Sequence, residues 1–243
     1  MRSSQSKADP RVFDPLSPGP AGFAHRGLHR GAQIPENSLS AFAAALDLGA
    51  GIECDLRLTA DDEIVIFHDA DASRLCGSPV RIGETRLDEL SHLKVGDQPI
   101  PTLASLLALV DGRVPLLLEA KVDRDLRRWV PALRRALGGY RGRYGVMSFD
   151  PRLARLLKTK MPEVLRGLVL RDSLPLVQRR AAMWLADPQF LSVERPALGK
   201  PWVRRARARL PVHSWTIRTA GERAQAAVHA DAFIWEGDGG PRT

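Results

Sequence analysis

Three carboxylates stand in two apolar segments of this sequence, at spacings that suit a metal site. Glu53 and Asp55 are two residues apart within the segment 51–58, so they share one face of a strand. Glu119 follows the apolar run 114–118. Carboxylate oxygens are the ligands that Mg²⁺ and Ca²⁺ prefer, whereas zinc favours histidine and cysteine. The residues therefore predict a Mg²⁺ or Ca²⁺ site at one rim; the alternative is two unrelated ion pairs at strand ends.

Two histidines that end apolar segments suit acid–base chemistry. His25 lies near the end of the segment 22–27 and is followed by Arg26. His68 ends the apolar segment 64–68. Imidazole titrates near neutral pH, so one ring can act as general base and the other as general acid. Arg26 and Lys121 add positive charge, and a guanidinium group matches the geometry of phosphate. Together with a cation, these residues predict phosphoryl chemistry.

The charged residues need a fold that gathers strand ends at one rim. Nine segments are predicted to be strands: 22–27, 51–58, 64–68, 114–121, 144–149, 165–170, 190–193, 212–217 and 232–235. The second and third are too close in the chain for a parallel crossover, so we expect them to form an antiparallel hairpin. The other eight, mostly followed by helical patterns, predict an α/β fold, a (β/α)8 TIM barrel.

Two segments fall outside the regular alternation of strand and helix. Residues 71–101 show no clear periodicity, which predicts an insertion after the hairpin, near the functional rim. Residues 1–20 contain four prolines and several serines, which predicts a lead segment that lies on the surface or is disordered. We therefore expect residues 21–243 to form a single barrel domain. A doubly wound sheet is disfavoured because no glycine-rich dinucleotide turn follows the first strand.

The composition excludes several classes of protein. The 243 residues are 44% hydrophobic and 26% charged, as in globular proteins, and no apolar stretch is long enough to span a membrane. The two cysteines and the absence of an apolar leader favour the cytoplasm. The net charge of +8 suggests nucleic acid or an anionic membrane, but the basic runs lie on helical patterns with few aromatic residues. They are therefore interpreted as solvated helix faces, and no nucleic-acid partner is predicted.

Taken in chain order, the motifs resemble those of the glycerophosphodiester phosphodiesterase family. The resemblance rests on His25-Arg26-Gly27, Pro35-Glu36-Asn37-Ser38, Gly51-Ile-Glu53-Cys-Asp55, Val65-Ile-Phe-His68-Asp69, Arg74, Glu119-Ala-Lys121, Ser148-Phe149 and Trp215-Thr216-Ile217. It implies a metal-dependent TIM-barrel hydrolase that cleaves glycerophosphodiesters to an alcohol and glycerol 3-phosphate.

The resemblance also implies roles for individual residues. His25 and His68 would be the catalytic acid–base pair, and the metal ligands would be Glu53, Asp55 and Glu119. Arg26 and Lys121 would bind the phosphate, and Trp215 would form an apolar wall of the substrate site. The preferred head group, the choice between Mg²⁺ and Ca²⁺, the nucleophile and the oligomeric state stay open at this point.

The sequence departs from the family pattern near its end. Arg218 stands where an asparagine often follows the Trp-Thr-aliphatic run, and Glu236-Gly237-Asp238 replaces the terminal Thr-Asp-x-Pro. Arg218 is expected to pair either with an anionic head group or with a surface carboxylate. Two rival functions are a lysophospholipase D-like activity, which needs a longer apolar groove, and a basic module that binds anionic lipid or nucleic acid without catalysis.

Overall fold

The computed structural model, which describes residues 14–123 and 125–241, contains a closed barrel of eight parallel strands. They are β1 (Phe23–Ala24), β2 (Gly51–Leu58), β6 (Leu116–Ala120), β7 (Tyr144–Ser148), β8 (Leu165–Leu170), β9 (Phe190–Glu194), β10 (Val212–Ile217) and β11 (Ala232–Trp235). The barrel is closed by β1, which pairs in parallel with both β2 and β11. The predicted (β/α)8 TIM barrel is confirmed.

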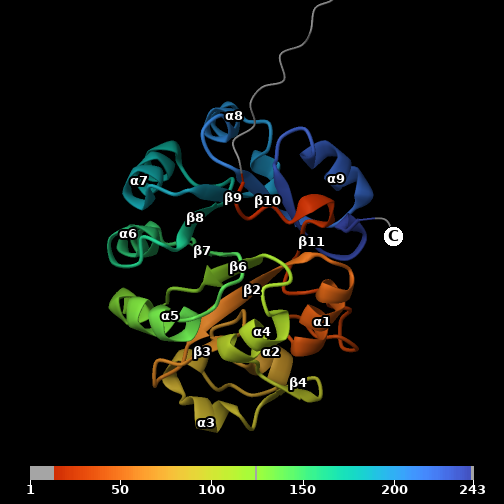
Figure 1. The fold of residues 1–243 in the computed structure, drawn as a ribbon, viewed down its shortest axis with the longest axis vertical. Coiled ribbons are helices and arrows are strands. Elements are labelled where there is room, and N and C mark those ends of the chain that lie inside the picture. The colour runs from red at the N-terminus through yellow and green to blue at the C-terminus, as the bar shows by residue number, and fades with distance from the viewer. Residues whose placement is uncertain (1–13, 124, 242–243) are drawn as a thin grey trace, which may run out of the picture.

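Helices surround the strands (Figure 1). Those of the outer ring are α1 (Leu39–Asp47), α4 (Leu103–Val110), α5 (Trp129–Leu137), α6 (Pro151–Lys160), α7 (Leu176–Ala186), α8 (Pro201–Arg207) and α9 (Ala220–Ala226). Polar side chains fix where helices begin. The Ser38 hydroxyl accepts a hydrogen bond from the Ala41 backbone N–H at the start of α1, and the Thr102 hydroxyl accepts one from the Ser105 N–H at the start of α4. Among the described residues, no helix combines the length and the apolar character that a membrane crossing requires.

The predicted hairpin and insertion are both present. Strand β3 (Ile64–Ile66) pairs antiparallel with β2 on the outside of the barrel. The insertion contains α2 (Ser73–Cys76), α3 (Leu87–Leu90), β4 (Lys94–Val95) and β5 (Gln98–Pro99), and it forms a lobe at the bottom of Figure 1. It has a small apolar core of its own, built from Val65, Phe67, Ala72, Ile82, Leu90, Val95 and Ile100. Its elements are too short to show a helical or strand period in the sequence.

Four of the predicted strands end earlier in the structure than predicted: β6 and β7 by one residue, and β1 and β3 by two or three. β1 stops at Ala24 because Arg26 and Gly27 have φ angles of 54° and 77°, in the left-handed region. A Cβ atom on Gly27 would lie 2.8 Å from Ala41, so the turn requires glycine. The predicted end at residue 27 was therefore wrong. β3 likewise ends at Ile66, which leaves His68 in a loop.

The segment before β1 closes the N-terminal end of the barrel. Leu16 is fully buried and packs with the first residues of several strands, including Phe23 and Phe190. Asp14 Oδ2 lies 2.8 Å from Nε2 of the buried His213. Part of the predicted lead segment is thus in the core, not on the surface. Residues 1–13 of that prediction lie outside the described residues.

Candidate active site

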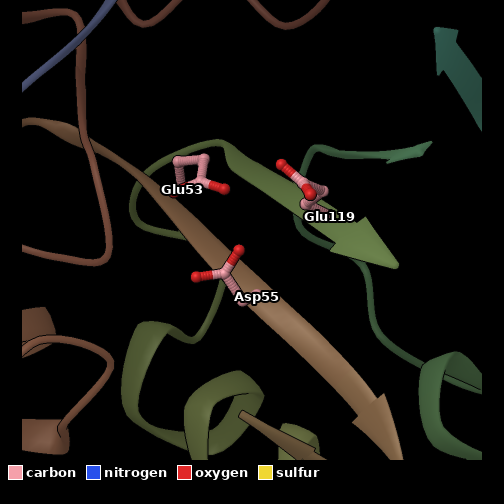
Figure 2. A group of neighbouring side chains, drawn as sticks. All are labelled: Glu53, Asp55 and Glu119. Atoms are coloured by element: carbon pink, nitrogen blue, oxygen red, sulfur yellow. The ribbon is translucent and has the colours of Figure 1, made fainter. Parts of the chain in front are cut away.

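The three predicted metal ligands lie together at the centre of the barrel. β2 and β6 are paired so that Asp55 is directly beside Glu119, and Glu53 shares the face of Asp55. One oxygen of each carboxylate lies within 4.8 Å of the other two, and Figure 2 shows the three side chains converging from the two strands. Glu53 and Asp55 are each 1% exposed and Glu119 is 7% exposed. Three carboxylates are therefore held close to one another with little water.

Cations offset this concentration of negative charge unevenly. Asp55 lies 2.8 Å from Lys121 Nζ and 3.2 Å from Arg26 Nε, and it accepts a hydrogen bond from Asn37 Nδ2 at 2.9 Å. Burial would raise the pKa of Asp55, but Lys121 and Arg26 hold this pKa well below its usual range. Burial raises the pKa of Glu119, although Lys121 also contacts that carboxylate.

Glu53 is the least compensated of the three carboxylates. Its Oε2 accepts the backbone N–H of Arg26 at 3.1 Å, whereas its buried Oε1 has no hydrogen-bond partner among the described residues. Burial, together with the charge of Asp55, raises the pKa of Glu53 to about 7. A buried acceptor without a donor beside two further carboxylates fits a divalent cation with oxygen ligands. The residues present thus suit the ion that the sequence predicts.

His25 is held by a glutamate that sequence reasoning did not assign. Its Nδ1 lies 2.5 Å from Oε1 of Glu236, which directly follows β11. A carboxylate can only accept, so Nδ1 carries the proton and Nε2 is directed to Glu53 Oε2 at 3.8 Å. Arg218 Nε lies 3.1 Å from the second oxygen of Glu236. The two departures from the family motif are therefore neighbours in space, and Arg218 forms the carboxylate pair that was one of its two expected roles.

His68 is held by a longer chain of charges. Its Nδ1 lies 2.8 Å from Oδ1 of Asp69, and Asp69 Oδ2 accepts from Arg74 Nε at 2.6 Å. Arg74 and Arg26 both bind Oε1 of Glu36 at 2.7 Å. The chain thus joins the insertion to the loop after β1. Glu36, which the motif left without a chemical role, couples the arginine beside His25 through Arg74 to the carboxylate beside His68.

A cavity of about 270 Å³ opens at this rim. All predicted site residues line it except Asp55, which lies in the buried carboxylate cluster: His25, Arg26, Glu53, His68, Glu119, Lys121 and Trp215. The rings of Trp215 and Phe149 pack edge to face with their centroids 5.7 Å apart. The guanidinium group of Arg171 lies over the Phe149 ring, 4.9 Å from its centroid. Phe149 belonged to a quoted motif without a role, while the only sequence signal for Arg171 was its place directly after β8. The cavity therefore has charged side chains around the carboxylate cluster and an aromatic surface formed by Trp215 and Phe149.

A closed parallel barrel whose C-terminal rim carries these carboxylates, imidazoles and cations belongs to the TIM-barrel enzymes. The model of the glycerophosphoryl diester phosphodiesterase family matches residues 25–235. The chain belongs to that family, and the resemblance found in the motifs is confirmed.

Individual relatives agree with this assignment. The chain is 34% identical over 100 residues to a glycerophosphodiester phosphodiesterase of Caldanaerobacter subterraneus; the match covers 37% of this chain and 40% of that protein. Two solved structures, each 24% identical, share the fold. A putative glycerophosphoryl diester phosphodiesterase from Silicibacter pomeroyi has a TM-score of 0.78, with 89% of this chain and 90% of that one covered. An Oleispira antarctica phosphodiesterase in complex with its product sn-glycerol-3-phosphate has a TM-score of 0.77, with 88% and 91% covered.

Proposed function

We propose that this protein hydrolyses glycerophosphodiesters to an alcohol and glycerol 3-phosphate, with a Mg²⁺ or Ca²⁺ ion held by Glu53, Asp55 and Glu119. The observation that carries the proposal is the position of the carboxylate cluster in one cavity with two imidazoles, each bound to a carboxylate through Nδ1. Family membership supports the reaction class. The product bound to the Oleispira enzyme supports the same glycerol phosphate product here.

The two imidazoles divide the proton transfers. In both rings the Nδ1 proton is committed to a carboxylate, so Nε2 is the atom that exchanges protons in the cavity. One Nε2 removes the proton of the attacking hydroxyl as its oxygen bonds to phosphorus. The other gives a proton to the departing alcohol oxygen as its bond to phosphorus breaks. The attacking hydroxyl belongs either to water, which gives glycerol 3-phosphate directly, or to the glycerol of the substrate. In the second case the alcohol leaves from a cyclic glycerol phosphate, and water then attacks phosphorus and opens the ring to glycerol 3-phosphate.

Fixed charge and an apolar wall position the diester. Arg26 and Lys121 line the cavity beside the carboxylates and offer donors to the phosphate oxygens. The bound cation would supply Lewis-acid stabilisation of charge on the phosphoryl group. Trp215 and Phe149 give the substrate an apolar surface, and Arg171 extends the positive charge along it.

An assay with defined diesters tests the proposal. Glycerophosphocholine and glycerophosphoethanolamine are incubated with the protein and Mg²⁺ or Ca²⁺, and glycerol 3-phosphate is measured enzymatically. We expect release that stops with a chelator and returns with added metal. Lysophosphatidylcholine is the matched control: faster turnover of this lipid would favour the lysophospholipase D alternative. No metal-dependent turnover of either substrate would contradict the proposal and favour a binding module.

A further inference from the structure

Helices α7 and α8 carry a surface that the proposed reaction does not use. They are neighbours in the outer ring, on the opposite side of the barrel from the insertion (Figure 1). Ala186 is the one fully buried residue of α7. Val177 and Trp184 are 78% and 83% exposed, and with Ala181 they recur at the spacing that places residues on one helix face. α7 therefore presents an apolar stripe to solvent.

Arginines without acidic partners lie on α7, on α8 and just after α8. α7 and α8 contain no aspartate or glutamate. Within the described part of the chain, no acidic side chain pairs with the arginines at four nearby positions: Arg180, Arg204, Arg205 and Arg209. The nearest acid along the chain, Asp187, is bound to Lys158 at 2.5 Å. This contrasts with the catalytic rim, where Arg26, Arg74 and Arg218 all have carboxylate partners.

A groove of about 680 Å³ is lined by residues of α7, α8 and the segment after α8, on another face of α7 from the stripe. Its apolar lining includes Leu176, Met183, Trp202 and Leu210. Its charged lining is Arg179, Arg180, Arg205 and Arg209 together with Asp187, the carboxylate bound to Lys158. Leu176 is 51% exposed at the start of α7. Arg179 stacks on Trp202 at 4.4 Å, which holds one cation against the apolar lining. The α7–α8 surface, defined by Leu176, Val177, Trp184 and these arginines, thus offers apolar contact beside uncompensated positive charge.

We propose that the α7–α8 surface docks the barrel onto an anionic lipid bilayer. Charge complementarity carries the choice of partner: the unpaired arginines match lipid phosphates, and Val177 and Trp184 enter the head-group region with α7 parallel to the membrane plane. Each arginine near an anionic surface strengthens binding by about fivefold. A nucleic acid would also attract the arginines, but it would leave the apolar stripe of α7 uncovered.

Docking would bring the catalytic rim close to the membrane. α7 begins at Leu176, five residues after Arg171, which lines the active-site cavity. The surface is separate from that cavity, so its role stands whether or not the proposed hydrolysis is correct.

Co-sedimentation with vesicles tests the proposal on the full chain. Vesicles of phosphatidylcholine alone are compared with vesicles that also contain phosphatidylglycerol. We expect binding to the anionic vesicles that weakens as salt is added, with a blue shift of tryptophan fluorescence. W184A and V177S each lower the partition coefficient about tenfold, and R180Q and R205Q about fivefold each. V228S, at a 68% exposed valine elsewhere, is the matched control and leaves binding unchanged.

The outcomes separate the docking surface from its rivals. All variants should turn over a water-soluble diester at the wild-type rate, since none of them lines the catalytic cavity. Equal vesicle binding by W184A, V177S and the wild type would overturn the proposal. So would retention of DNA or RNA without vesicle binding, or a dimer that W184A dissociates in the absence of lipid binding.

Discussion

The two ends of the barrel differ in the side chains that they bury: the C-terminal end buries mainly ionisable groups and the N-terminal end mainly apolar ones. At the C-terminal end, many ionisable side chains are buried or nearly so, among them Arg26, Glu53, Asp55, Glu119 and Lys121. At the N-terminal end, Leu16, Phe23 and Phe190 pack together, and the one buried imidazole there is paired with Asp14. Crowded charge at the first end costs stability, and apolar burial at the second offsets it. Substitutions at the C-terminal end should therefore change mainly turnover and metal binding, and those at the N-terminal end mainly stability.

The largest effect on turnover is expected from the two imidazoles. His25→Ala and His68→Ala should each lower kcat by about 10²-fold or more, because each removes one proton transfer. Both residues lie in loops, so the thermal midpoint should stay close to that of the wild type. Steady-state kinetics with glycerophosphocholine and thermal unfolding measure the two quantities. Wild-type turnover in either variant would end the acid–base assignment.

Glu53→Gln should separate function from stability at the catalytic end. Affinity for the divalent ion should fall by about tenfold or more, since one charged ligand is lost. The metal-free protein should become more stable, because the change removes a buried carboxylate next to Asp55. Titration calorimetry and denaturant unfolding in chelator test both expectations. A less stable metal-free variant with unchanged metal affinity would refute the metal site.

Glu236→Gln should lower kcat by about 10- to 100-fold, the usual loss when a partner that orients a catalytic or ligating imidazole is replaced. Glu236 is acceptor-only, whereas an amide can turn its NH₂ group to Nδ1 and reverse the tautomer. Asp69→Asn should lower kcat by a smaller factor, because the His68 side chain is 33% exposed and water can replace the carboxylate as its partner. KM should change little in either variant. Equal losses in the two would show that burial does not matter to these pairs.

Metal affinity should depend on pH through Glu53. Its pKa is raised from 4.5 to about 7, so between these values the metal-free folded protein holds a proton that the unfolded chain has released. The stability of the metal-free protein therefore falls as pH rises through this window. Metal binding displaces the proton, so affinity should rise up to about tenfold per pH unit and level off above pH 7. Calorimetry in buffers of different ionisation enthalpy measures the number of protons that metal binding releases. Glu53→Gln should abolish the dependence of the observed binding enthalpy on the buffer.

The smallest effect on turnover is expected at the opposite end of the barrel. Leu16→Ala should lower the free energy of unfolding by about 2–4 kcal/mol, because it leaves a cavity among fully buried side chains. Turnover per folded molecule should stay within about twofold of the wild type. Denaturant unfolding and kcat at low temperature measure the two. A large loss of kcat without loss of stability would show that the two ends are coupled.

Local patterns explain why most of the barrel could be predicted from the sequence. Strand β11 was found at its full length because a buried parallel strand forms a continuous apolar run. The pair Glu53 and Asp55 was informative because a two-residue spacing fixes a shared face. Neither inference needed knowledge of distant residues.

What could not be predicted depends on contacts that only barrel closure creates. Glu236 reaches His25 across 211 positions of sequence, and no local pattern reports which carboxylate faces which imidazole. Leu16 looks like part of a proline-rich lead, although it fills the end of the barrel. The end of β1 is set by the left-handed backbone of Arg26, which an apolar run does not reveal.

The shortness of β1 has a consequence for engineering this chain. Among the described residues, β1 itself contributes Phe23 and Ala24 to the pairing with β2 and β11. The next residue, His25, donates its backbone N–H to Trp235 O of β11 at 2.9 Å, so it is part of the same seam. Fusion partners joined tightly just before Phe23 therefore act on the position of His25 as well as on the barrel wall. A spacer ahead of residue 14 would keep an affinity tag from disturbing turnover.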